Sequence, residues 1–154
     1  MKNVLVVTFI ALLVLVLPTP GNTQHRNAHR AKQLRKVKCI RVDSFGKDSS
    51  AAAFRGLVLA ELVNKDQLKV INESWTEGAC GDFFLRLPAV LQGSLWIAKT
   101  GEITASANLV AATGGEVLWA WGKSGNRSTA DVAAQLAGDL TKCLGSKPDS
   151  TCPK

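Results

Sequence analysis

Histidine is almost absent from this sequence. The chain of 154 residues has two, His25 and His29, and both lie near its amino end. A Ser-His or Cys-His nucleophile needs an imidazole base, so the rest of the chain cannot form one. Glycine-rich phosphate loops that open a helix are absent as well. Positive charges surround the two histidines and disfavour a metal ion, so we expect no metal site there. From the absence of these motifs we also expect no cofactor and no enzymatic activity.

Three carboxylates are the remaining candidates for acid-base chemistry. Glu73, Glu77 and Asp82 share one irregular segment of the chain. Acidic side chains in an exposed loop are usually solvated surface residues, and we interpret these three in that way. An enzyme that uses them as acid and base is the minor alternative.

Long apolar runs are also missing, apart from one near the amino end. That run, residues 4–17, has about fourteen residues, whereas a helix that crosses a bilayer needs about twenty. Lys2 precedes it, and prolines and small residues follow it, as in a secretory signal. The first cysteine, Cys39, lies well beyond the run, so we expect no lipid-modified cysteine. We predict a cleaved signal peptide over residues 1–21 and a periplasmic or secreted protein.

Acidic residues are missing from the segment that follows. Residues 22–38 contain no acid and six basic residues, which are Arg26, Arg30, Lys32, Arg35, Lys36 and Lys38. The remaining body, residues 39–154, has twelve basic and twelve acidic residues, so we expect no nucleic-acid partner. We predict a flexible basic arm over residues 22–36 that is attracted to anionic lipid or glycan surfaces. The alternative is a linker that only adds solubility.

Four cysteines in an exported chain indicate two disulfides. Cys143 and Cys152 flank a turn with glycine and proline, so we pair them, which leaves Cys39 with Cys80. The alternative for Cys39 is a small buried side chain that never oxidises.

The first half of the body predicts a β-α-β unit. Residues 37–42 are typical of a strand, and apolar residues at helical spacing predict a helix over residues 51–63. Ser49 or Ser50 can cap that helix. A second strand is expected over residues 67–72.

The second half predicts three strands and a helix. The strands cover residues 90–99, 103–113 and 116–123, and two adjacent glycines separate the last two as in a hairpin. Ser128 can start a final amphipathic helix that ends near residue 144. The order β-α-β-loop-β-β-β-α predicts an α/β two-layer sandwich over residues 37–145, with a mixed sheet of about five strands and two main helices. Residues 146–154 would form a tail that a disulfide tethers.

The hairpin also suggests where two tryptophans pack. Val117, Trp119 and Trp121 would share one strand face if the alternation is regular. The two indoles can then fill the space over Ala105 and Ala107, and we prefer this packing role to ligand stacking.

Residues 90–140 resemble the CsgG-like domain of bacterial envelope proteins. The segment reads VLQGSLWIAKTGEITASANLVAATGGEVLWAWGKSGNRSTADVAAQLAGDL, and the earlier VDSFG and AAAFRGLVLAEL resemble the opening strand and first helix of that domain. The family occurs in curli-secretion lipoproteins and in the penicillin-binding-protein activator LpoB, and the amino-terminal domain of TolB is a looser relative. The residues that match family motifs are Gly93, Ser94, Thr113, Gly114, Gly115, Glu116 and Trp119.

The resemblance implies a non-enzymatic domain that works by protein contacts in the bacterial envelope. One branch of the family assembles a secretion channel and the other activates a peptidoglycan synthase. We therefore expect an envelope protein partner or self-association. Channel-forming relatives have a long membrane-inserting hairpin where this chain has about ten residues, so no pore is expected.

Overall fold

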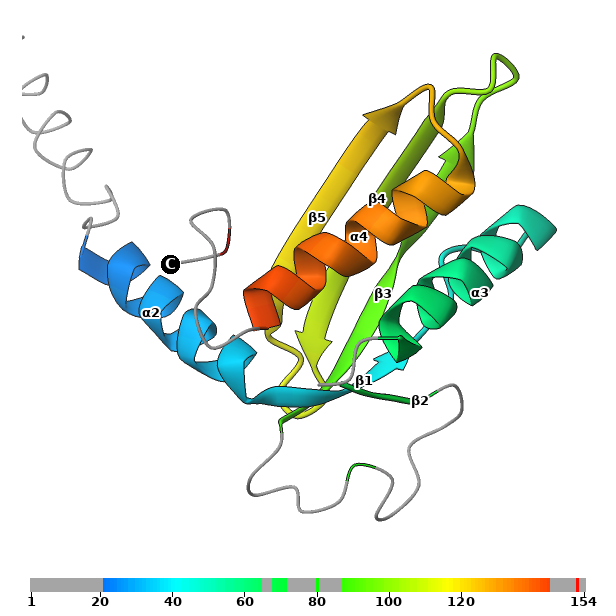
Figure 1. Ribbon diagram of the computed structural model, residues 1–154. Coiled ribbons are helices and arrows are strands. Elements are labelled where there is room, and N and C mark those ends of the chain that lie inside the picture. Colours follow the sequence, from blue (N-terminus) through cyan, green and yellow to red (C-terminus); the bar gives the residue numbers. More distant parts are fainter. Residues whose placement is uncertain (1–20, 65–67, 72–79, 81–86, 145–151, 153–154) are drawn as a thin grey trace, which may run out of the picture.

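The computed structural model describes residues 21–64, 68–71, 80, 87–144 and 152 (Figure 1). Its elements in chain order are α2 (Gly21–Lys36), β1 (Val37–Val42), α3 (Ser49–Val63), β2 (Lys69–Ile71), β3 (Leu87–Ile97), β4 (Ile103–Ala111), β5 (Val117–Gly125) and α4 (Thr129–Leu144). The predicted signal peptide lies outside the described residues except for Gly21, and so does the predicted tail except for Cys152. Glu73, Glu77 and Asp82 are outside them too.

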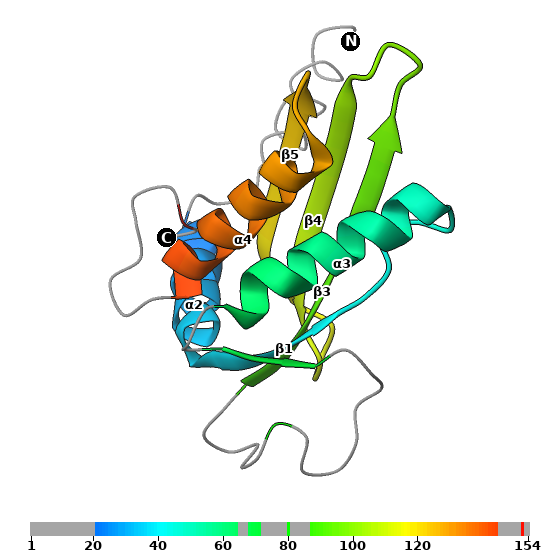
Figure 2. The same ribbon diagram turned by 45° about the vertical axis from the view of Figure 1, so that its right-hand side comes forward.

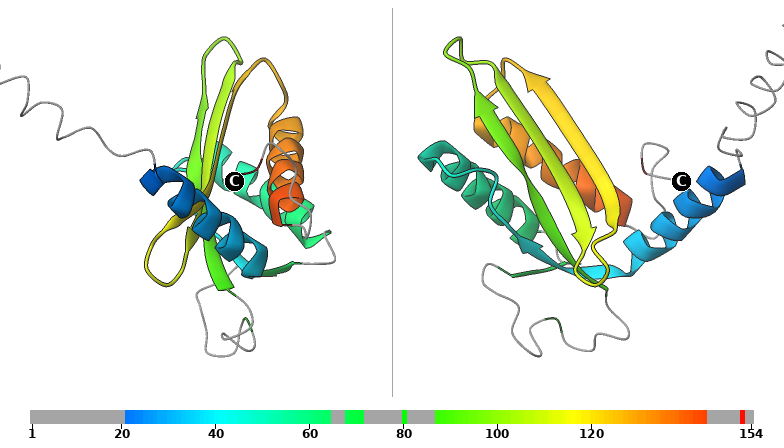
Figure 3. Two further views of the ribbon diagram at one scale, coloured as in Figure 1. Left: turned by 90° about the vertical axis from the view of Figure 1, so that its left-hand side faces the viewer. Right: turned by 180° about the vertical axis from the view of Figure 1, so that it is seen from behind.

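One mixed sheet of five strands forms the centre of the fold. The strand order is β2-β1-β3-β4-β5. β1 pairs in parallel with both β2 and β3, whereas β4 pairs antiparallel with β3 and β5. Helices α3 and α4 lie side by side on one face of the sheet (Figures 2 and 3). The predicted two-layer α/β sandwich is confirmed.

The core lies between the sheet and these two helices. In β4 the alternate residues from Ile103 to Ala111 are buried, as expected for a strand with one covered face. Phe45, just after β1, packs edge-on against Phe54 of α3, with ring centroids 5.1 Å apart. The ring of Phe45 also lies over Gly93, where an added Cβ would come within 2.8 Å of it. Gly93 therefore makes room in the core for Phe45.

The expected flexible arm is a helix. Residues 21–36 form α2, because the segment beyond Gly21 has neither glycine nor proline and is rich in good helix formers. Its single leucine, Leu34, is only 1% exposed, and α2 packs against β5 and α4. Just before β5, Glu116 contacts Arg30 Nε at 3.4 Å and His29 Nδ1 at 3.7 Å. The structure thus has a packed helix where the sequence predicted a flexible arm, because composition alone carries no information on these contacts.

Two details of the predicted elements also differ. Asp48, and not Ser49 or Ser50, caps α3, because its carboxylate accepts a hydrogen bond of 2.7 Å from the backbone N–H of Ala51. At the other helix the prediction is confirmed, since Ser128 Oγ accepts from the N–H of Asp131 at 3.1 Å.

The pairing of β4 with β5 shows that Val117, Trp119 and Trp121 do not all share one strand face, although the sequence predicts that they do. One extra residue in β5 shifts the register between Leu109 and Val110, so Val117 is 40% exposed instead of sharing the buried face of Trp119. Trp121 lies opposite Ala107, as the packing role requires, and Ala105 lies opposite Lys123 instead of an indole.

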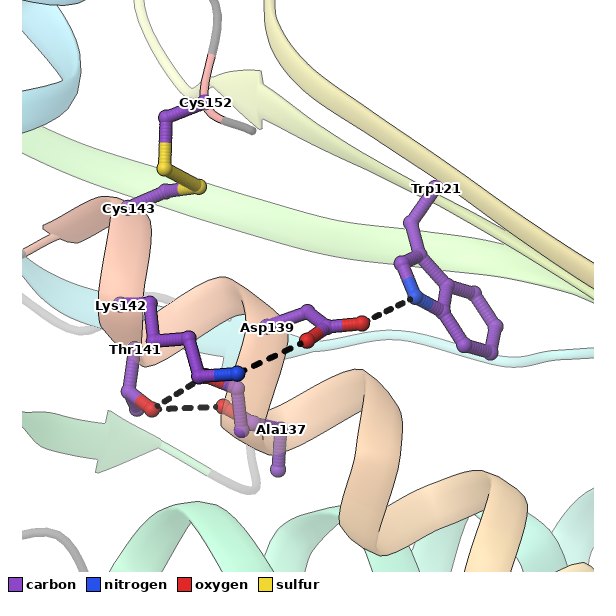
Figure 4. The surroundings of a disulfide bond; sticks show 8 residues. Trp121, Ala137, Asp139, Thr141, Lys142, Cys143 and Cys152 are labelled. Carbon is purple, nitrogen blue, oxygen red and sulfur yellow. Dashed lines mark hydrogen bonds and ion pairs between the residues drawn. A yellow bond between two sulfur atoms is a disulfide. The ribbon is translucent and has the colours of Figure 1, made fainter. Parts of the chain in front are cut away.

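Both predicted disulfides are present. Cys39 in β1 is bonded to Cys80, and Cys143 in the last turn of α4 is bonded to Cys152 (Figure 4). The alternative of an unoxidised Cys39 is therefore wrong. Beside the second bridge, the indole N–H of Trp121 donates to Asp139 Oδ2 at 3.1 Å, which ties β5 to α4.

Across the described residues, no helix is long and apolar enough to cross a membrane.

Candidate binding surface

The face of the sheet opposite α3 and α4 is not covered by either helix (Figure 3, right). Because side chains alternate along a strand, the residues between the buried ones of β3, β4 and β5 belong to this face. We call it the open face. Its central residues are Gln92, Ser94, Trp96, Thr104, Ser106, Asn108, Ala120, Gly122 and Ser124.

Hydroxyl groups on the open face pair across the strands. Ser94 of β3 and Ser106 of β4 are directly opposite, and their oxygens are 2.8 Å apart. Thr104 and Ser124 form a second pair at 3.0 Å, and Ser124 donates to Glu102 at 2.9 Å. A hydroxyl has one donor and two acceptor positions, so each paired group still has capacity for a ligand.

A hollow of about 400 Å³ lies at one end of this row of hydroxyls. It is lined by Asp43, Ser44, Gln92, Gly93, Ser106 and Asn108. The amides of Gln92 and Asn108 face each other in register across β3 and β4 and make no side-chain hydrogen bond to any described residue. Asp43 accepts a hydrogen bond of 3.3 Å from Arg41, so one carboxylate in the hollow already has a positive partner.

Trp96 lies at the other end of the row, near the β3–β4 turn. It is 61% exposed, which is unusual for the largest aromatic side chain. Its neighbour Ile97 is 41% exposed. The β3–β4 hairpin extends past the ends of α3 and α4 (Figure 1), so neither helix covers this end of the strands.

The family-motif residues do not form one site. Gly93 accommodates Phe45, Ser94 belongs to the open face, and Trp119 is buried. Gly114 and Gly115 have positive φ angles of 87° and 66° in the β4–β5 turn, which only glycine adopts readily. Thr113 lies in the same turn, and the carbonyl of Glu116 accepts from the N–H of Ala111 at 2.9 Å. These motifs shape turns and core.

The basic residues lie mainly on α2. Lys32, Arg35 and Lys36 are exposed, whereas Arg30 pairs with Glu116 and Lys38 is half-buried in β1. The side chain of Arg26 lies outside the part of the chain that is described.

In the described part of the chain, no three His, Cys, Asp or Glu side chains are placed to hold a metal ion.

The open face and its hollow were not predicted from the sequence. The pattern that could have revealed this face is a set of exposed or half-buried residues at every second position. In β3 this set ends at Trp96, and in β4 it runs from Thr104 to Asn108.

Fold and surface together define an α/β sandwich with one helix-covered and one uncovered sheet face. Its fold is similar to that of TolB from Acinetobacter baumannii, with a TM-score of 0.53 and 11% identity over 73% of this chain. The match spans 29% of the TolB chain.

Two further solved structures have TM-scores below 0.5. A PelC dodecamer from Paraburkholderia phytofirmans has a TM-score of 0.46 and 16% identity, with 72% of this chain and 91% of that chain covered. A lipoprotein from Neisseria meningitidis has a TM-score of 0.42 and 15% identity, with 73% and 99% covered. No protein-family model matches the sequence, and no curated protein matches it. The resemblance to the CsgG-like domain therefore stays an interpretation of the sequence.

Proposed function

We propose that this chain is a non-enzymatic, exported binding module that holds a component of the cell envelope on the open face of its sheet. The observation that carries the proposal is Trp96, a large aromatic side chain that is 61% exposed on a face that α3 and α4 leave uncovered. Exposed aromatic side chains are frequent anchors of binding, because they bury much area at a small cost in side-chain entropy.

Three observations support export and an envelope role. The two disulfides favour an oxidising compartment, which lies outside the cytoplasm. The amino-terminal sequence is typical of a secretory signal. The fold is shared with TolB, and the sequence resembles a domain of envelope proteins. The resemblance implies that the partner is an envelope protein or a second copy of this chain.

Co-sedimentation with isolated bacterial envelopes tests the proposal. Residues 22–154, produced in an oxidising compartment, are compared with the variant Trp96→Ala. Loss of an anchor residue costs more than about 1 kcal/mol, so the dissociation constant should rise at least about fivefold. Val63→Ala is the matched control, because Val63 is 62% exposed but lies on α3.

A folded Trp96→Ala protein that binds envelopes as tightly as the unmodified chain would contradict the proposal. Static light scattering without detergent separates the two partner classes that the resemblance implies. A defined oligomer supports self-association, and a monomer supports a different partner.

Recruitment by α2 is the second candidate, and the exposed positions of Lys32, Arg35 and Lys36 favour it. Cations close to an anionic membrane gain about 1 kcal/mol each. Changing all three to glutamine should abolish sedimentation with phosphatidylglycerol vesicles at low salt, while leaving binding to neutral vesicles unchanged. Equal vesicle binding by both proteins would rule this candidate out.

A further inference from the structure

Building on the proposed function, we propose that the component held on the open face is a neutral glycan, and not the protein partner that the family resemblance implies. Its sugar rings lie along β3, with one ring stacked on Trp96 and another hydrogen-bonded in the hollow lined by Gln92, Ser106 and Asn108. The argument rests on the side chains of this face, on their spacing and on their charge.

The side chains suit a ligand rich in hydroxyl groups better than a protein. The core of a protein–protein interface is enriched in aromatic residues, methionine and arginine and is depleted of serine. The centre of the open face has one aromatic residue, and its other side chains are hydroxyls, amides, an alanine and a glycine, while the paired valines Val90 and Val110 continue the face beyond Gln92 and Asn108. A sugar ring presents alternating donors and acceptors, and hydroxyl and amide side chains can satisfy both kinds.

The side-chain amides of Gln92 and Asn108 strengthen the assignment of a sugar ligand. Gln92 and Asn108 lie opposite each other in register, and neither makes a side-chain hydrogen bond to a described residue. Each amide offers one carbonyl acceptor and two N–H donors in one plane. Two adjacent hydroxyls of a sugar can therefore each form a hydrogen bond with the same amide group. The backbone of Gly93 also lines the hollow.

The spacing fits several linked sugars instead of one. Gln92 and Trp96 are four residues apart on one strand, which places them about 13 Å apart at the usual rise per residue. Ser94 and its partner Ser106 lie between them on the same face. The flat C–H side of a sugar ring packs against an indole ring, while the hydroxyls at its edge remain free for the polar side chains. A short oligosaccharide spans this distance.

Charge selects a neutral ligand. None of the nine central residues of the open face is charged. Two acids lie at its ends: Asp43 has a positive partner, Arg41, at 3.3 Å, and Glu102 accepts a hydrogen bond of 2.9 Å from the hydroxyl of Ser124. Arg41, a cation on this side of the sheet, is paired with Asp43, and the exposed cations Lys32, Arg35 and Lys36 belong to α2.

Titration of residues 22–154 with cellohexaose and with N-acetylchitohexaose tests the inference by heteronuclear NMR. We expect at least one of the two neutral oligomers to shift the indole N–H signal of Trp96 and the side-chain amide signals of Gln92 and Asn108. Alginate and chitosan oligomers serve as the anionic and cationic comparisons, and should bind at least about tenfold more weakly. Trp96→Ala and Asn108→Ala should each weaken binding at least about fivefold, whereas Trp96→Phe keeps a ring and should restore most of it. Val63→Ala should bind like the unmodified chain.

Each outcome decides between the two proposals. Saturable binding of a neutral oligomer that depends on Trp96 and Asn108 supports the inference. If no neutral oligomer binds while Trp96→Ala still loses envelope binding, the inference is wrong and the proposed function stands. If Trp96→Ala changes neither readout in a folded protein, both are wrong. Preference for an anionic oligomer that disappears when Lys32, Arg35 and Lys36 are replaced would assign glycan binding to α2 and overturn the inference.

Discussion

Single residues decide the shape of the open face and of the core beneath it. Gly93 is the clearest case, because its missing side chain leaves room for a core residue while its backbone lines the hollow. The ring of Phe45 lies against it from the core, and its backbone lines the hollow from the other side. Any larger residue at this position would collide with the ring of Phe45.

Replacement of Gly93 by alanine should therefore be costly. The added Cβ would lie 2.8 Å from the Phe45 ring and 2.0 Å from the carbonyl oxygen of Ser106, so both must move. Overpacking of this kind costs about 1–3 kcal/mol, which urea unfolding measures as a lower midpoint. Gly138→Ala is the control, since nothing lies within 4 Å of the added Cβ, and alanine in a helix gains up to about 1 kcal/mol. An unchanged midpoint for Gly93→Ala would show that Phe45 has another place to pack.

Sequence reasoning reached some of these residue positions and not others. The pairing of Trp121 with Ala107 follows from the alternation of strand residues, but the extra residue in β5 breaks that alternation and exposes Val117. A bulge depends on the partner strand, so one strand's sequence does not reveal it. The exposure of Trp96 likewise depends on which face the helices cover.

At the scale of elements, the ends of helices show how local chemistry selects a boundary. Asp48 and the serines after it are all suitable caps by residue type. Asp48 has an extended backbone, with φ −88° and ψ 169°, and its carboxylate reaches the N–H of Ala51. Ser49 is already the first residue of the helix, so its hydroxyl no longer has that geometry.

The cap assignment predicts different effects for adjacent substitutions. Asp48→Ala should lower the free energy of unfolding by about 1 kcal/mol, because the hydrogen bond to Ala51 is lost. Ser49→Ala should change it little, since Ser49 is exposed. Thermal unfolding of the two variants measures both effects. Equal losses for Asp48 and Ser49 would mean that the two residues share the capping role.

The element at the amino end was the least predictable. Charge dominates the composition of residues 22–36, and a basic stretch usually indicates a solvated arm. Leu34 and the contacts of Arg30 and His29 with Glu116 instead hold α2 on the body. These contacts join residues that are more than eighty positions apart, as the separation of 86 between Arg30 and Glu116 shows, and local patterns carry no information on them.

On the scale of the whole molecule, the two-layer class was predictable because it follows from the order of elements. The order of strands in the sheet was not, since the sequence between β2 and β3 does not specify that β3 joins the far side of β1. The prediction of the disulfide pairing rested on the turn between Cys143 and Cys152, and the structure confirms that pairing.

The two bridges should stabilise the molecule unequally. Cys39 and Cys80 are 41 positions apart, whereas Cys143 and Cys152 are 9 apart. Loop entropy in the unfolded chain predicts contributions of about 4 kcal/mol for the longer loop and about 2.5 kcal/mol for the shorter one. Replacing each pair by alanine and following urea unfolding measures this ranking. A larger loss for the shorter loop would show that its bridge acts mainly through contacts at the end of α4.

The order of the cysteines along the chain also bears on how the molecule matures. Each bridge joins a cysteine to the next one in sequence, the first to the second and the third to the fourth. A chain that crosses a membrane amino end first presents its thiols to an external oxidant in that same order. The correct partner of each thiol would then be the first one to arrive, so we expect an exported chain to need a thiol oxidant but no disulfide isomerase.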